Sequence, residues 1–169
     1  MAAEEYLPPP AWHATLPGVV LAAAALIRDD DGRVLVVKPN YRDFWTLPGG
    51  ICEFGEAPHA GCGREVAEEI GLRLPVGRML AVDWQLPMDI YGPEARAAVY
   101  FVFDSGVLHS LSGVRLQEAE LDDCRFAAET ELAALLAEPT VPRIRAAISS
   151  LSSGCPRYVP GLGDGEQPG

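Results

Sequence analysis

The spacing of residues 50–72 constrains this chain more than any other feature of its sequence. The segment reads G-x5-E-x7-R-E-U-x-E-E-x-G-U, where U is an aliphatic residue, and every position is met. Pro58 suits the first turn of a helix and Gly71 suits the position just after its end. The segment therefore predicts a helix over residues 57–70. Seven fixed positions, each at roughly 7% usage, coincide on the order of 10⁻⁸ times per window by chance.

Three glutamates of this segment share one helix face, because Glu65, Glu68 and Glu69 stand at positions i, i+3 and i+4. Like charges at this spacing oppose one another by a few tenths of a kcal/mol per pair. A divalent cation reverses that sign, since carboxylate oxygens are the ligands that Mg²⁺ prefers. The alternative is a solvated acidic helix face, and the complete pattern around the glutamates favours the metal site.

The complete pattern from Gly50 to Leu72 resembles the signature of the Nudix hydrolases. The resemblance implies an α/β fold, an α/β/α sandwich with a mixed β-sheet, in which this segment forms a loop–helix–loop. It also implies hydrolysis of the pyrophosphate bond in a nucleoside diphosphate linked to another group, with Mg²⁺ or Mn²⁺ as cofactor. The motif is specific for the family and says little about the substrate.

Charge and composition restrict the partners. The chain has 169 residues and a formal net charge of −11, which suits one globular domain and argues against nucleic-acid polymers and anionic membranes. A small phosphorylated nucleotide remains compatible, because bound cations invert the local field.

Four cysteines without C-x-x-C spacing predict free thiols in a reducing compartment. With no basic segment at the start of the chain, we expect a cytoplasmic enzyme. Nudix relatives are often dimers, so a homodimer is possible.

The rest of the chain predicts one domain between two extended ends. We expect an extended lead-in over residues 1–16, the Nudix domain over 17–151, and a loose Gly/Pro-rich tail over 152–169. An Asp-Gly turn at residues 31–32 predicts a hairpin between the first two strands. The expected strands are 19–28, 33–38, 76–86, 97–104 and 121–127, the expected later helices are 129–138 and 141–151, and 41–50 is expected as a loop.

The resemblance also assigns roles to residues of the motif. It implies Glu65 and Glu69, followed by Glu68, as metal ligands, with the backbone carbonyl of Gly49 completing the site. A glycine there leaves room for close approach of the backbone to the metal. It further implies that Arg64 pairs with Glu56 and holds the loop against the helix, as a bidentate arginine–carboxylate pair does. The alternative is that Glu56 is itself a ligand.

The general base and the nucleotide contacts lie outside the motif. Glu120, just before an expected strand, is our candidate base, and its alternatives are a solvated turn residue or a glutamate of the motif. Three aromatic residues are candidates for stacking on the substrate: Tyr41, Trp45 and Trp84. Packing beside the loop is the alternative for Trp45, and a core position is the alternative for Trp84.

Several functions remain open at this stage. Pro87 follows Leu72 by 15 residues, a distance associated in the family with ADP-ribose-type substrates, which slightly favours ADP-ribose or a nucleotide sugar. A loop proline at the end of a strand is the alternative explanation. The competing functions are a nucleoside triphosphate pyrophosphohydrolase, a non-catalytic nucleotide-sensing domain, and an isomerase of isoprenoid diphosphates.

Overall fold

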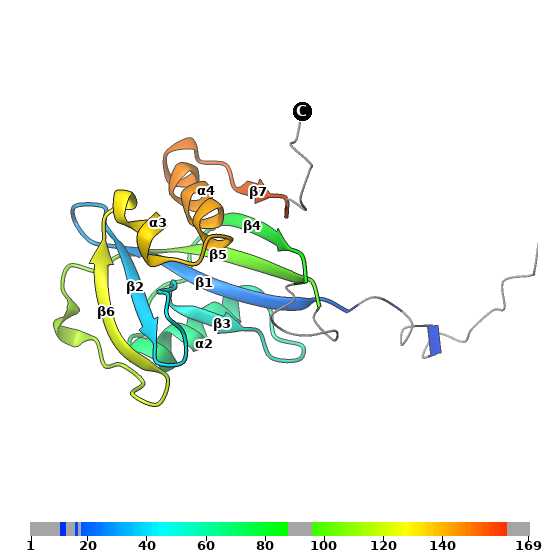
Figure 1. Ribbon diagram of the computed structural model, residues 1–169, viewed down its shortest axis with the longest axis horizontal. Helices are drawn as coiled ribbons and strands as arrows, with labels where there is room; N and C mark the ends of the chain where they lie inside the picture. Colours follow the sequence, from blue (N-terminus) through cyan, green and yellow to red (C-terminus); the bar gives the residue numbers. More distant parts are fainter. Residues whose placement is uncertain (1–10, 13–15, 17, 88–95, 162–169) are drawn as a thin grey trace, which may run out of the picture.

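The fold places a seven-stranded mixed sheet between helices (Figure 1). The computed structural model describes residues 11–12, 16, 18–87 and 96–161. The strands are β1 (Val20–Arg28), β2 (Val34–Pro39), β3 (Gly49–Ile51), β4 (Met79–Gln85), β5 (Ala98–Val107), β6 (Leu121–Ala127) and β7 (Arg157–Val159). The helices are α2 (Pro58–Ile70), α3 (Leu132–Leu135) and α4 (Thr140–Ser153), with short 3₁₀ helices η2 (Leu111–Gly113) and η3 (Glu129–Glu131).

Strand β1 organises the sheet, whose order is β6-β2-β1-β5-β4-β7 with β3 paired to β1 outside this path. It pairs antiparallel with β2 and β3 and parallel with β5. The predicted hairpin is confirmed: Gly32 has φ 78° in the turn between β1 and β2, a conformation that glycine adopts at no steric cost. The parallel and antiparallel pairs together make the mixed sheet that the resemblance implied.

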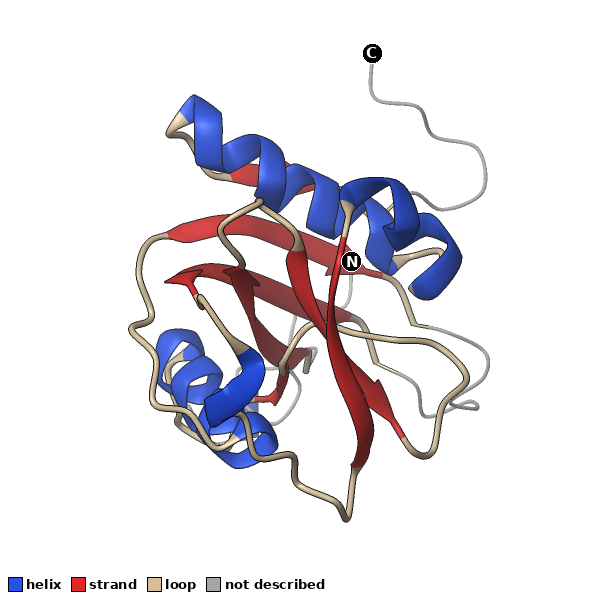
Figure 2. Cartoon of the chain, turned by 90° about the vertical axis from the view of Figure 1, so that its left-hand side faces the viewer, coloured by secondary structure: helices blue, strands red, loops and turns tan. Residues whose placement is uncertain are grey.

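Helices cover both faces of the sheet (Figure 2), and each face carries its own hydrophobic core. On one face, Leu26 and Val36 pack with Ile144 of α4. On the other, Ile27 and Leu35 pack with residues of α2 such as Val66. Neighbouring strand residues face opposite sides of a sheet, so an apolar run like β1 serves both layers. This arrangement is the predicted α/β/α sandwich. The described helices include none long and apolar enough to cross a bilayer.

Three segments differ from the prediction. The expected helix over 129–138 is instead the 3₁₀ helix η3 followed by α3, which ends at Leu135. Residues 49–51 form β3 rather than the end of a loop, because pairing with β1 outweighs the low strand propensity of glycine. The expected loose tail is wrong for residues 152–153 and 157–159: α4 continues to Ser153, and β7 pairs in parallel with β4. Most of the expected lead-in and residues 162–169 lie outside the described residues.

Candidate functional site

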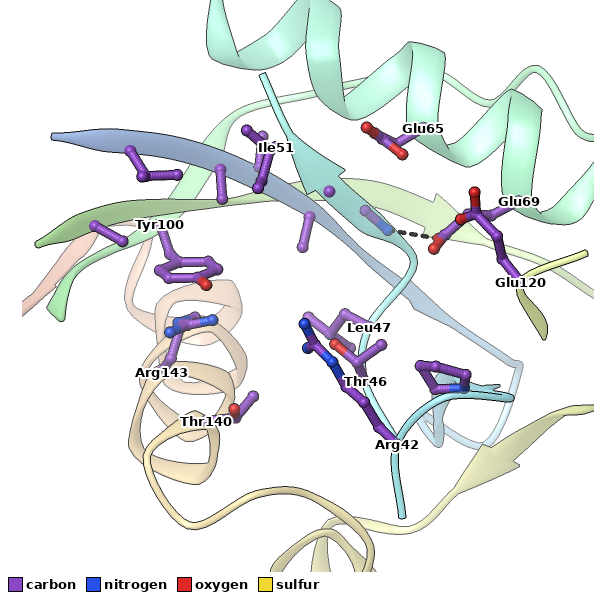
Figure 3. A pocket seen from close by; sticks show the side chains of 18 of the residues that line it. Arg42, Thr46, Leu47, Ile51, Glu65, Glu69, Tyr100, Glu120, Thr140 and Arg143 are labelled. Atoms are coloured by element: carbon purple, nitrogen blue, oxygen red, sulfur yellow. Dashed lines mark hydrogen bonds between the residues drawn. The ribbon is translucent and has the colours of Figure 1, made fainter. Parts of the chain in front are cut away.

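A cavity of about 670 Å³ lies beside the central strands (Figure 3). Its walls come from β1, β3, β5, α2 and α4, together with the loops that precede β3 and β6. Cavities of this size hold ligands as large as a nucleotide. The glutamates of α2 line one end, and side chains of β5 and α4 line another part (Figure 3).

Glu69 is the most deeply buried acidic residue of the cavity. Only 7% of it is exposed, and its Oε2 accepts a hydrogen bond of 2.8 Å from the backbone N–H of Gly49. Burial raises the pKa of Glu69 to about 8, against the opposing hydrogen bond from Gly49, and the negative charges of Glu65, Glu120 and Glu68 raise it further. Such a carboxyl group is ionised at neutral pH only when positive charge is close by.

Glu65 lies directly against β3. A Cβ atom added to Gly50 would stand 2.5 Å from the carboxyl carbon of Glu65, so only a glycine leaves the carboxylate its place. Burial raises the pKa of Glu65, while its hydrogen bond and ion pair with Arg64 lower it. The strand β3 thus positions two carboxylates of α2: Gly49 binds Glu69, and Gly50 makes room for Glu65.

Arg64 connects the loop to the helix face. Its Nε and Nη2 donate to the two oxygens of Glu56 at 3.1 and 3.0 Å, and Nη2 also donates to the carbonyl of Ile51 at 3.1 Å. Its Nη1 donates to Glu65 at 3.0 Å and to Glu68 at 2.9 Å. The predicted bidentate pair of Arg64 and Glu56 is therefore present, and the same guanidinium also orients two further carboxylates.

We expect Arg64→Lys to lower turnover roughly 10- to 100-fold, the usual effect of losing a residue that orients metal-binding side chains. A lysine lacks the planar fork that binds both oxygens of Glu56 and the Ile51 carbonyl at once. Steady-state kinetics and amide hydrogen exchange over residues 51–56 would measure the loss and the loosening of the loop. Arg125→Lys is the matched control, since Arg125 pairs with Glu131 and does not line the cavity. Unchanged kinetics and exchange in Arg64→Lys would contradict the assigned role.

The carboxylates do not form a complete metal site as they lie. Among the described residues, no group of three acidic, histidine or cysteine side chains is arranged to hold a metal ion. The hydrogen bonds explain why: Glu65 and Glu68 turn toward Arg64, while Glu69 turns toward Gly49. The side chain of Glu68 is 51% exposed, so only its hydrogen bond and ion pair with Arg64 hold it in this orientation. The donor types still fit Mg²⁺ or Mn²⁺, which prefer carboxylate oxygens.

Glu120 joins this cluster from the turn before β6. It lines the cavity, and Figure 3 shows it beside Glu69. Its charge raises the pKa of both Glu65 and Glu69, which requires that the three lie near one another. The backbone N–H of Asn40 donates to the Glu120 carbonyl at 2.9 Å and fixes the turn. Glu120 thus lies close enough to the glutamates of α2 to serve them, and its role as a base stays a prediction.

The aromatic candidates separate into one that lines the cavity and two that do not. Tyr41 lines it and is 64% exposed. Trp45 packs against the core on the α4 face, with the guanidinium of Arg125 over its ring at 5.4 Å. Trp84 alternates with Asp83 on β4 and so faces away from α4. The positions of Trp45 and Trp84 outside the cavity formed by the described residues do not support stacking on a substrate.

The cavity also contains residues that the sequence analysis missed, chiefly Arg42, Tyr100, Thr140 and Arg143. No motif connects them, since they come from a loop, a strand and a helix. One signal was available: Arg143 stands beside the apolar positions Val141 and Ile144 of an amphipathic helix. An arginine at the edge of an apolar face often has a buried partner.

Comparisons with known proteins place the chain in a family. The family model of the NUDIX domain matches residues 19–149. A MutT-like protein of Streptomyces ambofaciens is 35% identical over 79 residues, which cover 47% of this chain and 47% of that protein. The chain thus spans about half the length of this curated relative.

Solved structures agree in fold. The structure titled UDP-X diphosphatase has a TM-score of 0.67 at 24% identity, covering 91% of this chain and 76% of that one. An ADP-ribose pyrophosphatase from Streptococcus suis has a TM-score of 0.60 at 22% identity, covering 83% of this chain and 99% of that one. Because the family model covers most of the chain and these structures share its sandwich, the chain belongs to the Nudix family.

Proposed function

We propose that this chain is a pyrophosphohydrolase that cleaves the diphosphate bond of a nucleoside diphosphate linked to a sugar, such as ADP-ribose or a nucleotide sugar. The observation that carries the proposal is one cavity in which Glu65, Glu68, Glu69 and Glu120 gather at one end. Relatives in fold are named as a UDP-X diphosphatase and an ADP-ribose pyrophosphatase, which supports the substrate class. Pro87 does not line the cavity formed by the described residues, so the proposal does not rest on it.

Glu65, Glu68 and Glu69 would hold a divalent metal, with the Gly49 carbonyl as a further ligand. Such a metal neutralises phosphate charge and lowers the pKa of a bound water. The raised pKa of the buried Glu69 supports this assignment, because a cation supplies the positive charge that the carboxylate lacks. The oxygen ligands fit Mg²⁺ and Mn²⁺ equally.

The remaining polar residues have their own roles. Glu120 is exposed beside the cluster and accepts a proton from the attacking water. The guanidinium of Arg42 lies over the rings of Tyr41 and Phe44 at 5.1 and 5.6 Å, and it forms no ion pair with a described residue. It binds a phosphate oxygen of the substrate. Lys38 donates to the backbone carbonyls of Pro39 and Arg42 and so stabilises this loop.

The test is product release from ADP-ribose, UDP-glucose, dinucleotides and nucleoside triphosphates, with Mg²⁺ and then Mn²⁺. Hydrolysis of a sugar-linked diphosphate by the wild type, lost in Glu69→Gln, is the expected result. If the wild type preferred nucleoside triphosphates, the proposed substrate class would be wrong and the proposed hydrolysis of a phosphate anhydride would stand. Tight nucleotide binding by calorimetry without any product would replace the reaction by nucleotide sensing.

Mg²⁺ affinity should depend on pH through Glu69. Its pKa of about 8 means that metal binding displaces a proton at lower pH. We therefore expect the apparent dissociation constant for Mg²⁺ to fall about tenfold per pH unit between pH 6 and 8, and then to level off. Titration calorimetry at several pH values measures it, and activity should favour neutral to alkaline pH. Equal affinity at pH 5 and pH 8.5 would refute the assignment of Glu69 as a ligand.

A further inference from the structure

The part of the cavity away from the glutamates contains a stacked pair. Tyr100 of β5 and Arg143 of α4 both line the cavity, and the central carbon of the guanidinium lies 3.6 Å from the centre of the tyrosine ring (Figure 3). A guanidinium within about 6 Å of a ring centre is attracted by the electron-rich face. At this short distance the ring rests on the guanidinium and cannot tilt toward α4.

The guanidinium of Arg143 is itself fixed from behind. Its Nε donates to Oδ2 of Asp83 at 2.7 Å, and Nη2 lies 2.7 Å from the same oxygen. Nη2 also donates to the side chain of Gln85 at 3.2 Å. Arg143 and Asp83 are only 7% and 4% exposed. Buried ion pairs add little net stability over apolar residues of the same size, so the stability of the fold does not account for this pair.

The consequence is a rigid and nearly neutral wall. The opposite charges of Asp83 and Arg143 compensate each other, so the pair offers no net charge to a ligand. The hydroxyl group of Tyr100 points into the cavity, and no described residue forms a hydrogen bond with it (Figure 3). Thr140 adds a second hydroxyl-bearing side chain nearby (Figure 3).

The surrounding residues leave room for a ring beside Tyr100. Ala22, Ala24 and Ala98 line the floor with small side chains, and Ile51 lines the cavity from β3. A sugar ring presents apolar C–H faces together with hydroxyl groups that donate and accept, and the phenolic hydroxyl likewise does both. A phosphate would find its charge partner at Arg42 or Arg96 instead, since both arginines line the cavity and neither has a carboxylate partner among the described residues.

We propose that the Tyr100 hydroxyl, positioned by the Arg143–Asp83 pair, is a specificity-determining group that hydrogen-bonds a sugar hydroxyl of the substrate. This inference rests on the proposed hydrolase function and narrows it: the enzyme distinguishes substrates by a sugar hydroxyl remote from the scissile bond. That hydroxyl belongs either to the linked sugar or to the ribose of the nucleoside. Arg143 acts as a positioning residue.

Tyr100→Phe tests the inference with the smallest possible change, because the ring and its stacking on Arg143 are retained. The measured quantity is kcat/KM for ADP-ribose, for the methyl ester of ADP, and for the 2′-deoxy and 3′-deoxy forms of that ester. A site that binds a substrate hydroxyl rejects analogues that lack it, so the wild type should prefer the substrate with the hydroxyl. We expect Tyr100→Phe to shrink that preference at least tenfold, mainly through KM.

The substrates distinguish the two sources of the hydroxyl. If the preference for ADP-ribose over the methyl ester collapses, the linked sugar is recognised. If the preference for the methyl ester over a deoxy form collapses, the nucleoside ribose is recognised. Tyr158→Phe is the matched control, since Tyr158 on β7 is 66% exposed and does not line the cavity. Unchanged preferences in Tyr100→Phe would overturn the inference even if hydrolysis is observed, whereas a wild type inactive on all substrates would overturn the proposed function itself.

Discussion

Glu69→Gln should lower turnover by roughly 10²- to 10³-fold and at the same time make the metal-free protein more stable at pH 8. The loss of turnover follows from removing a buried negative charge that would bind the metal, in a site where electrostatic groups contribute most to catalysis. Glutamine keeps the shape of the side chain, and its amide oxygen still accepts from the Gly49 N–H. The folded structure therefore tolerates the change.

The gain in stability follows from the direction of the pKa shift. Glu69 has a pKa of about 8 in the folded protein, whereas a glutamate in an unfolded chain titrates near its ordinary value of 4.5. Between these two values the folded state holds a proton that the unfolded state has lost, so stability falls as pH rises, by up to about 1.4 kcal/mol per pH unit. Glutamine has no proton to lose, and its presence removes this part of the pH dependence.

Thermal unfolding of the two proteins from pH 5 to pH 8, with chelator and then with Mg²⁺, measures the effect. In chelator, the melting temperature of the wild type should fall below that of Glu69→Gln as the pH rises. Mg²⁺ should raise the melting temperature of the wild type far more than that of Glu69→Gln. Glu118→Gln is the matched control, since Glu118 is exposed and does not line the cavity. If the melting temperature of the wild type in chelator fell no further between pH 5 and pH 8 than that of Glu69→Gln, the argument would be wrong.

The candidate metal ligands lie in one continuous segment of the sequence. Glu65, Glu68, Glu69 and Arg64 all lie within six residues, so local helix geometry alone brings them to one side. The hairpin of β1 and β2 was equally local, because one Asp-Gly turn encodes it. Both could be predicted, since neither depends on how distant parts of the chain meet.

The other half of the cavity could not be predicted for the opposite reason. Asp83, Tyr100 and Arg143 lie on β4, β5 and α4, and each is 17 or more positions from the next in sequence. Only the pairing of β4 with β5 and the packing of α4 on that face bring them together. Trp45 and Trp84 illustrate the same difficulty, because the side of the sheet that an aromatic ring faces depends on register.

Gly49 has a structural reason to be a glycine beside the one that the sequence suggested, and together with Gly50 it allows a sharp test. We ascribed Gly49 to close approach between backbone and metal. In the fold, φ at Gly49 is 146°, and an added Cβ would lie 2.3 Å from the carbonyl oxygen of Ala23 and 2.5 Å from the Cα of Ala24. The glycine is required by the pairing of β3 with β1, and its backbone N–H binds Glu69 as a consequence.

Gly49→Ala should therefore destabilise the whole protein, and Gly50→Ala should mainly impair the site. Backbone strain and overpacking at Gly49 together cost ~2–5 kcal/mol, which lowers the melting temperature by on the order of 10 °C in a chain of this size. The three atoms nearest to a Cβ at Gly50 all belong to the carboxylate of Glu65, the end of a flexible side chain. That carboxylate moves aside, so the melting temperature changes little while turnover and Mg²⁺ affinity fall roughly 10- to 100-fold.

Calorimetric melting of each variant in chelator, together with Mg²⁺ titration and steady-state kinetics of whatever remains folded, separates the two effects. Gly63→Ala is the matched control within α2, since an added Cβ there meets only a methyl group of Val76 at the ordinary distance of 3.4 Å. If the melting temperature of Gly50→Ala were as low as that of Gly49→Ala, the carboxylate of Glu65 would be needed for the stability of the fold and would not be a side chain that can move aside. If Gly50→Ala instead kept full Mg²⁺ affinity, the place of Glu65 against β3 would be irrelevant to the metal.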